Sequence, residues 1–72
     1  MKKIKKIKIK INGKFSIINE NLSLSVFLKQ LKIPIKKVAI ELNQEIIDKN
    51  TTKIIKLKKN DMVEIVHFIG GG

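Results

Sequence analysis

The sequence has no cysteine, arginine, tryptophan or tyrosine, and it contains one proline and one histidine. Without cysteine, disulfide bonds and thiolate metal sites are excluded, so sulfur chemistry on this chain would need sulfur supplied by another molecule. This composition fits a reducing, cytoplasmic compartment. No run approaches the roughly 18 consecutive apolar residues of a membrane span, and the lysine-rich start is not followed by the apolar core of a signal peptide. We therefore expect neither membrane association nor a secretory leader.

Lysine accounts for the strong positive charge. The chain carries 16 basic residues against 6 acidic ones, for a formal net charge of +10. A basic domain can bind nucleic acid, but the arginines that read bases are missing and the phenylalanines offer few stacking surfaces. We predict that the lysines form a solvated surface, which can steer the domain toward acidic partner proteins, and that the chain does not bind nucleic acid.

A length of 72 residues predicts one small domain over residues 1–72, with no linker, internal repeat or second domain. A folded chain of this size buries only about 60% of the surface that its unfolded form exposes, so we expect a compact core. The predicted helices and strands should therefore pack as layers around that core.

A β-hairpin is predicted at the start of the chain, where isoleucine and lysine alternate with the period of two residues that is typical of a strand. Asn12-Gly13 predicts the turn. A two-residue turn would mix apolar and polar side chains on each face. A three-residue connection, with the glycine in a G1 bulge, would pair Ile9 with Phe15 and separate an apolar face from a lysine face. We prefer this connection, which also pairs Ile7 with Ile17.

An amphipathic helix is predicted after the hairpin. Ser23 stands at the N-cap position, because its side-chain oxygen can accept a hydrogen bond from a backbone amide of the first turn. Pro34 should end the helix by Ile33, since the residue before a proline is pushed out of helical geometry. Four apolar side chains recur at helical spacing and should cover a sheet: Leu24, Phe27, Leu28 and Leu31.

The rest of the chain predicts further strands. Alternating apolar residues mark a strand over 38–42, a short strand over 44–47 follows a tight turn, and the turn at 60–61 leads into a last strand over 62–69. Residues 48–57 carry no clear pattern. Since the last strand is apolar at nearly every position, we place it in the middle of the sheet. One helix across one face of a mixed sheet of four or five strands gives a two-layer α+β domain.

The two faces of the last strand are expected to differ. If Val63 and Ile65 face the helix, then Val66 and Phe68 share the outer face with Glu64. Two exposed apolar residues at this place predict a surface that docks a partner. Single exposed apolar residues are also common on protein surfaces and need no function.

No catalytic arrangement is recognisable in the sequence. Nucleophilic catalysis needs an activated Ser, Thr or Cys beside a base, and His67 is the sole histidine. A lone histidine on a strand is more often a surface residue than a base, and zinc would need three or four ligands. Glu41 and Glu45 are most simply solvated charges. We therefore predict that the chain is not an enzyme but a carrier or substrate for other enzymes, with no metal and no cofactor of its own.

Gly70-Gly71-Gly72 follow the last strand as a flexible tail. Glycine has no Cβ, so such a tail can enter a narrow active site and present its carboxylate there. Terminal residues are also often frayed, without any role. The glycines alone leave both interpretations open.

Two segments carry a family resemblance: residues 38–47, and the run over 59–72 that places Val-Glu-Ile-Val-His-Phe before the glycines. Together with the turn and the helix start predicted above, they resemble ThiS, the sulfur carrier family of thiamine biosynthesis. The resemblance implies a β-grasp, ubiquitin-like fold. The chain departs from the family at residues 48–50, where Pro-Arg is often found, and at Asn60, which replaces a common turn glycine.

The resemblance also implies chemistry at the tail. An E1-like adenylyltransferase (ThiF-like) would use ATP to convert the Gly72 carboxylate into an acyl-adenylate, and sulfur from a donor system would displace AMP to leave a thiocarboxylate. A thiazole synthase (ThiG-like) would then take this sulfur into the thiazole ring of thiamine. Gly70 and Gly71 would give access to the active sites. The scheme assigns docking of the partner proteins to three residues, Val66, Phe68 and Ile69.

Three other functions stay open. A small subunit of molybdopterin synthase shares the fold and the chemistry but serves another pathway. A ubiquitin-like protein modifier would carry Gly72 in isopeptide linkage to lysines of other proteins. A basic nucleic-acid-binding module would not need the tail, and its affinity would fall steeply with salt.

Overall fold

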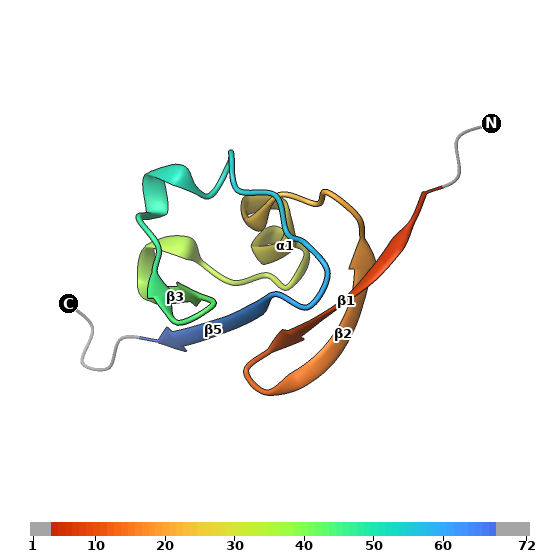
Figure 1. Ribbon diagram of the computed structural model, residues 1–72. Helices are drawn as coiled ribbons and strands as arrows, with labels where there is room; N and C mark the ends of the chain where they lie inside the picture. The colour runs from red at the N-terminus through yellow and green to blue at the C-terminus, as the bar shows by residue number, and fades with distance from the viewer. Residues whose placement is uncertain (1–3, 68–72) are drawn as a thin grey trace.

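Five strands form one mixed sheet in the computed structural model, which describes residues 4–67 (Figure 1). The strands are β1 (Lys6–Ile11), β2 (Lys14–Asn19), β3 (Val38–Leu42), β4 (Glu45–Ile46) and β5 (Met62–His67). Their order across the sheet is β2-β1-β5-β3-β4. β5 runs parallel to β1 and antiparallel to β3. The predicted mixed sheet, with the last strand in its middle, is confirmed.

The described residues contain one α-helix, α1 (Leu24–Gln30), which lies across one face of the sheet (Figure 1). Its start is as predicted, because the Ser23 hydroxyl oxygen accepts a hydrogen bond from the Val26 amide at 3.2 Å. Two short 3-10 helices complete the structure, η1 (Ile35–Lys37) before β3 and η2 (Lys49–Thr51) after β4.

The helix ends at Gln30, within the predicted limit of Ile33, and the chain leaves it through a Schellman motif. Lys32 takes a left-handed φ of 59°. The Lys32 amide donates to the Lys29 carbonyl at 3.0 Å, and the Ile33 amide donates to the Leu28 carbonyl at 3.0 Å. These two hydrogen bonds satisfy the last helical carbonyls and turn the chain back toward the sheet.

The predicted hairpin register is wrong. Asn12-Gly13 form a two-residue turn with φ angles of 49° and 82°, so Ile9 lies opposite Ser16 rather than Phe15. Positive φ at both positions is typical of the type I′ turn, whose twist matches that of the paired strands. The geometry of the turn, and not the alternation of apolar residues, therefore sets the pairing of β1 with β2. Phe15 and Ile17 consequently face solvent, with 65% and 62% of their surface exposed.

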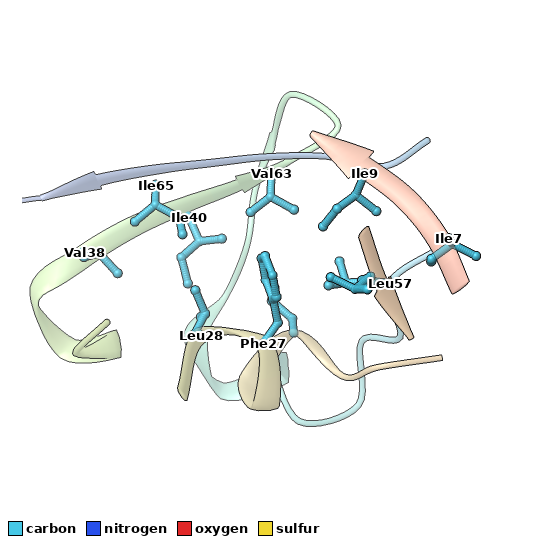
Figure 2. Packing of buried hydrophobic residues seen from close by; sticks show 11 residues of the cluster. Ile7, Ile9, Phe27, Leu28, Val38, Ile40, Leu57, Val63 and Ile65 are labelled. Carbon is cyan, nitrogen blue, oxygen red and sulfur yellow. The ribbon is translucent and has the colours of Figure 1, made fainter. Parts of the chain in front are cut away.

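The core lies between α1 and the inner face of the sheet (Figure 2). Leu57, from the segment without a clear pattern, is fully buried because its backbone amide donates to the Leu22 carbonyl at 2.8 Å and holds it beside the helix. Leu31, expected in the buried stripe, is instead exposed at the end of α1. The buried apolar residues are Ile7, Ile9, Ile18, Leu24, Phe27, Leu28, Val38, Ile40, Leu57, Val63 and Ile65.

Two asparagine side chains hold β5 from either side. Asn12 Oδ1 accepts a hydrogen bond from the Ile65 amide at 2.7 Å, and Asn12 Nδ2 donates to the Ile65 carbonyl at 3.4 Å. Asn43 Oδ1 accepts a hydrogen bond from the backbone amide of Met62 at 2.9 Å, and the backbone amide of Asn43 donates to the Met62 carbonyl at 2.8 Å. Each asparagine lies in the turn of one hairpin. The two turns therefore satisfy backbone groups of β5 that the neighbouring strands do not reach.

We expect Asn12→Gly to lower the free energy of unfolding by about 1–2 kcal/mol, because the Ile65 amide loses its partner in the middle of the sheet. Glycine suits the positive φ of this turn, so the loss would come from the side chain. Urea unfolding measures the change. The control is Asn60→Gly, at another exposed position with positive φ (70°), which we expect to shift the free energy by less than about 0.5 kcal/mol. Equal effects of the two changes would contradict the role of the Asn12 side chain.

We expect Lys32→Gly to raise the free energy of unfolding by about 0.5–1 kcal/mol, because glycine adopts the left-handed C′ position without the crowding that a Cβ causes. Thermal and urea unfolding measure this effect. Lys29→Gly makes the same change inside the helix, where we expect the free energy of unfolding to fall by about 1 kcal/mol. A loss at both positions would contradict the Schellman geometry of the helix end.

Candidate functional site

The predicted docking face of β5 is oriented as the sequence analysis expected. Val63 and Ile65 are buried against the helical layer, and Glu64 and Val66 therefore point to the opposite face. Val66 is 56% exposed, which is far more than its place in a central strand requires. The β-strand thus presents an apolar side chain to solvent close to the point where the chain continues toward the glycines.

The remaining predicted site residues lie outside the part of the chain that the structure describes. They are the docking residues Phe68 and Ile69, the access residues Gly70 and Gly71, and the modified residue Gly72. Their roles stay predictions. The described part of the site is the outer face of the sheet that leads to them.

Further exposed apolar side chains share the outer face of β5. Lys10 lies opposite Phe15 in β2 and opposite Met62 in β5, so these residues lie on the same face. Ile46 of β4 lies opposite Glu41 on that face as well. We call the whole set the outer apolar surface, and its members are Phe15, Ile17, Ile46, Met62 and Val66.

Sequence reasoning found one residue of this surface and missed the others. Phe15 and Ile17 were assigned to the core by the wrong hairpin register. A signal was present, because Asn-Gly is the strongest sequence indication of a two-residue type I′ turn. Met62 follows from the same alternation that places Glu64 and Val66 on the outer face. The position of Ile46 depends on the pairing of β4 with β3.

Charge divides the outer face into two parts. Lys8 and Lys10 of β1 place their Nζ atoms 4.6 Å and 5.1 Å from the ring centroid of Phe15, and this cation–π geometry stabilises the exposed ring. On the other side, Glu41 and Glu64 lie directly opposite each other in β3 and β5. Like charges in opposed positions destabilise a sheet. A complementary partner would present acidic groups toward β1 and basic groups toward β3 and β5.

The other predicted residues of interest lie apart from one another. His67 is exposed at the end of β5, opposite Val38, and Glu45 is exposed in β4. Within residues 4–67, no three His, Asp or Glu side chains come together in a way that could hold a metal ion. The helices in that range are too short and too polar to cross a membrane. The described residues thus place exposed apolar side chains on the strand that precedes Gly70-Gly71-Gly72 in the sequence.

A five-stranded mixed sheet with one helix packed across it, and with an exposed apolar face on the other side, defines a β-grasp, ubiquitin-like domain. The crystal structure of a thiamine biosynthesis protein, ThiS, from Geobacter metallireducens is similar to it, with a TM-score of 0.81 and 32% identity over 92% of this chain and 100% of that one. Residues 4–72 match the sequence model of the ThiS family. The chain belongs to the ThiS family.

Two further relatives are similar to the chain over part of one or both sequences. A sulfur carrier protein ThiS from Bacillus subtilis is 49% identical over 37 residues, which cover 51% of this chain and 56% of that protein. A thiazole synthase from Magnetococcus marinus is 35% identical over 66 residues, or 92% of this chain. The chain spans only 20% of the length of that synthase. A domain like this one is therefore part of a longer polypeptide in the synthase.

We expect Glu41→Gln to raise the free energy of unfolding by about 0.5 kcal/mol at low salt, because it removes the repulsion from Glu64 across the strand pair. Urea unfolding at low and high salt measures the effect, which salt should weaken. Glu45→Gln removes an equal charge from an edge strand and serves as the control for the change in net charge. If both variants behave alike, the repulsion between Glu41 and Glu64 is too weak to matter.

Proposed function

We propose that the protein is a sulfur carrier of thiamine biosynthesis whose C-terminal glycine is activated and loaded with sulfur by other proteins. The observation that carries this proposal is the ThiS-family β-grasp domain, whose sequence places Gly70-Gly71-Gly72 soon after the central strand β5. The similarity to the sulfur carrier protein ThiS of Bacillus subtilis supports the same class.

The chemistry of the proposal requires an activated carboxylate. A carboxylate is a poor acyl donor until one of its oxygens becomes part of a good leaving group. The Gly72 carboxylate attacks the α-phosphorus of ATP on an E1-like adenylyltransferase, and pyrophosphate leaves. Hydrosulfide delivered by the donor system then attacks the carbonyl carbon, the bond to the AMP phosphate breaks, AMP leaves, and loss of the sulfur-bound proton gives the thiocarboxylate. The carrier binds no cofactor, because ATP belongs to the activating enzyme.

The role of the glycines follows from their lack of a side chain. Gly70 and Gly71 can pass through a narrow channel that a Cβ would obstruct, so Gly72 reaches the reacting phosphate. β5 is the described element that precedes Gly70-Gly71-Gly72 in the sequence. The backbone of β5 is held on both sides by neighbouring strands and by the side chains of Asn12 and Asn43. The position of β5 relative to the outer apolar surface is therefore fixed.

A thiazole synthase is the proposed acceptor of the sulfur. In the Magnetococcus marinus thiazole synthase, a segment similar to this chain belongs to the same polypeptide as the rest of that enzyme. Joining two proteins in one chain raises their effective concentration toward each other, and this is useful where the two must meet in every reaction cycle. A separate carrier needs a docking surface for the same encounter. We assign that role to the outer apolar surface, together with Phe68 and Ile69.

We expect the activating enzyme to convert the wild-type protein into a species in which sulfur replaces one oxygen, located at Gly72 by fragmentation. The measurement is intact-mass spectrometry after incubation with ATP, the adenylyltransferase and a sulfur donor. Deletion of Gly72 or Gly71→Phe should abolish this species and leave the unfolding curve unchanged. An isopeptide linkage of Gly72 to lysines of other proteins would identify a modifier instead.

We expect Val66→Asp to raise the KM of the adenylyltransferase for the carrier by about tenfold, which corresponds to roughly 1.4 kcal/mol of binding. ATP and pyrophosphate exchange measures this value. Ile54→Asp, at a position that is 76% exposed outside the sheet, is the matched control and should leave KM unchanged. Equal effects would show that added negative charge, and not the outer apolar surface, alters binding.

A further inference from the structure

A surface cavity lies in the helical layer, on the side of the domain away from the outer apolar surface. Its volume is about 470 Å³, and it is lined by α1, by the chain after α1 and by η2. Figure 1 shows η2, in teal, next to α1 and above the sheet. A volume of this size falls in the range of about 300–1,000 Å³ that small-molecule sites occupy.

The floor of this cavity is apolar. Leu28 of α1 is buried, and Ile33 and Ile35 are half-buried beside it. Ile33 is held there by the Schellman motif, in which its amide donates to the Leu28 carbonyl. An apolar ligand body placed on these three side chains would remove their remaining exposed surface from water.

Lysines surround that floor. Lys29 from α1 and both Lys49 and Lys53 from the η2 segment line the cavity, and none of its described lining residues is acidic. The nearest carboxylate along the chain, that of Asp48, is engaged as the cap of η2, because it accepts a hydrogen bond from the Asn50 amide at 2.9 Å. Lys29 and Lys53 therefore bring positive charge to a cavity that has apolar lining residues and no acidic one among those described.

The walls are held in place before any ligand binds. The Ser25 amide donates to the Thr52 carbonyl at 3.1 Å and the Leu24 amide donates to the Ile55 carbonyl at 2.9 Å, so the first turn of α1 is tied to the η2 segment. Thr52 is almost fully buried, and its hydroxyl donates to the Lys49 carbonyl at 3.0 Å. Binding to such a preformed site needs little ordering of the protein.

We propose that this cavity binds a small organic anion, with a phosphate or a carboxylate on an apolar body. The apolar body lies on Leu28, Ile33 and Ile35, and the anionic group lies toward Lys29 and Lys53. Both groups are needed, since surface lysines alone attract anions only weakly and a bare apolar floor would not select charge. The site does not depend on sulfur transfer, and it lies in the layer opposite the surface assigned to docking.

The test uses naphthyl phosphate and naphthoate as probes, followed by amide NMR spectra of the isotope-labelled protein. We expect shifts centred on Leu28, Ile33 and Lys53 with at least one of these probes, and the stronger of the two identifies the preferred anion. Naphthol, which has the ring without the charge, and inorganic phosphate, which has the charge without the ring, should each bind at least about fivefold more weakly.

The double variant Lys29→Gln/Lys53→Gln should weaken the better probe by about fivefold or more. Lys5→Gln/Lys14→Gln removes the same charge from exposed positions away from the cavity and should leave the affinity unchanged. Lys53→Glu alone should weaken binding further, and unfolding curves show whether each variant is folded.

Three results would overturn the proposal. The first is equal binding of naphthol, which would mean that the lysines do not select an anion. The second is an equal loss of affinity in both double variants, which would mean that the probe responds only to the overall charge of the protein. The third is the absence of shifts at the cavity, including the case in which they occur at the smaller cavity of about 240 Å³ beside Phe15 and Met62.

Discussion

The pairing of β5 with β1 and β3 is the interaction on which the rest of the structure depends. β5 comes last in the described chain, yet it joins the two hairpins into one sheet. Its register with β1 rests on few residues, and Asn12 and Asn43 extend it with side-chain hydrogen bonds. The turns of both hairpins therefore serve two purposes. They reverse the chain, and they fix the central strand that links the halves of the domain.

The two faces of β5 contribute differently to stability. Val63 and Ile65 complete the core beneath α1, and they stabilise the domain by removing apolar surface from water. Glu64 and Val66 on the other face contribute little to stability, and the opposition of Glu41 and Glu64 reduces it. These exposed side chains at the centre of the sheet are available for contact with a partner. The proposed carrier must also separate from each partner, so a modest, charge-divided surface suits this role better than a large apolar one.

The two layers of the domain offer separate surfaces. The sheet presents the outer apolar surface beside the strand that leads to the glycines. The helical layer presents the lysine-lined cavity, whose floor is formed by Leu28, Ile33 and Ile35. Because the core lies between them, a protein partner on the sheet and a small anion on the helical side would not compete for the same residues.

The sequence by itself determined the local features of this protein. The N-cap at Ser23 and the alternation along β3 depend on residues within a few positions of each other. The α+β class and the resemblance to the ThiS family follow from several such local patterns taken in sequence order. The tertiary structure decided the features that need contact between segments far apart in the sequence. The burial of Leu57 requires that its segment run beside α1, and the cavity requires that η2 lie next to that helix. The exposure of Phe15 lies between these cases. Asn12-Gly13 is a local signal for the two-residue turn, but the apolar pattern favoured a three-residue connection, and the strand pairing shows that the local turn sets the register.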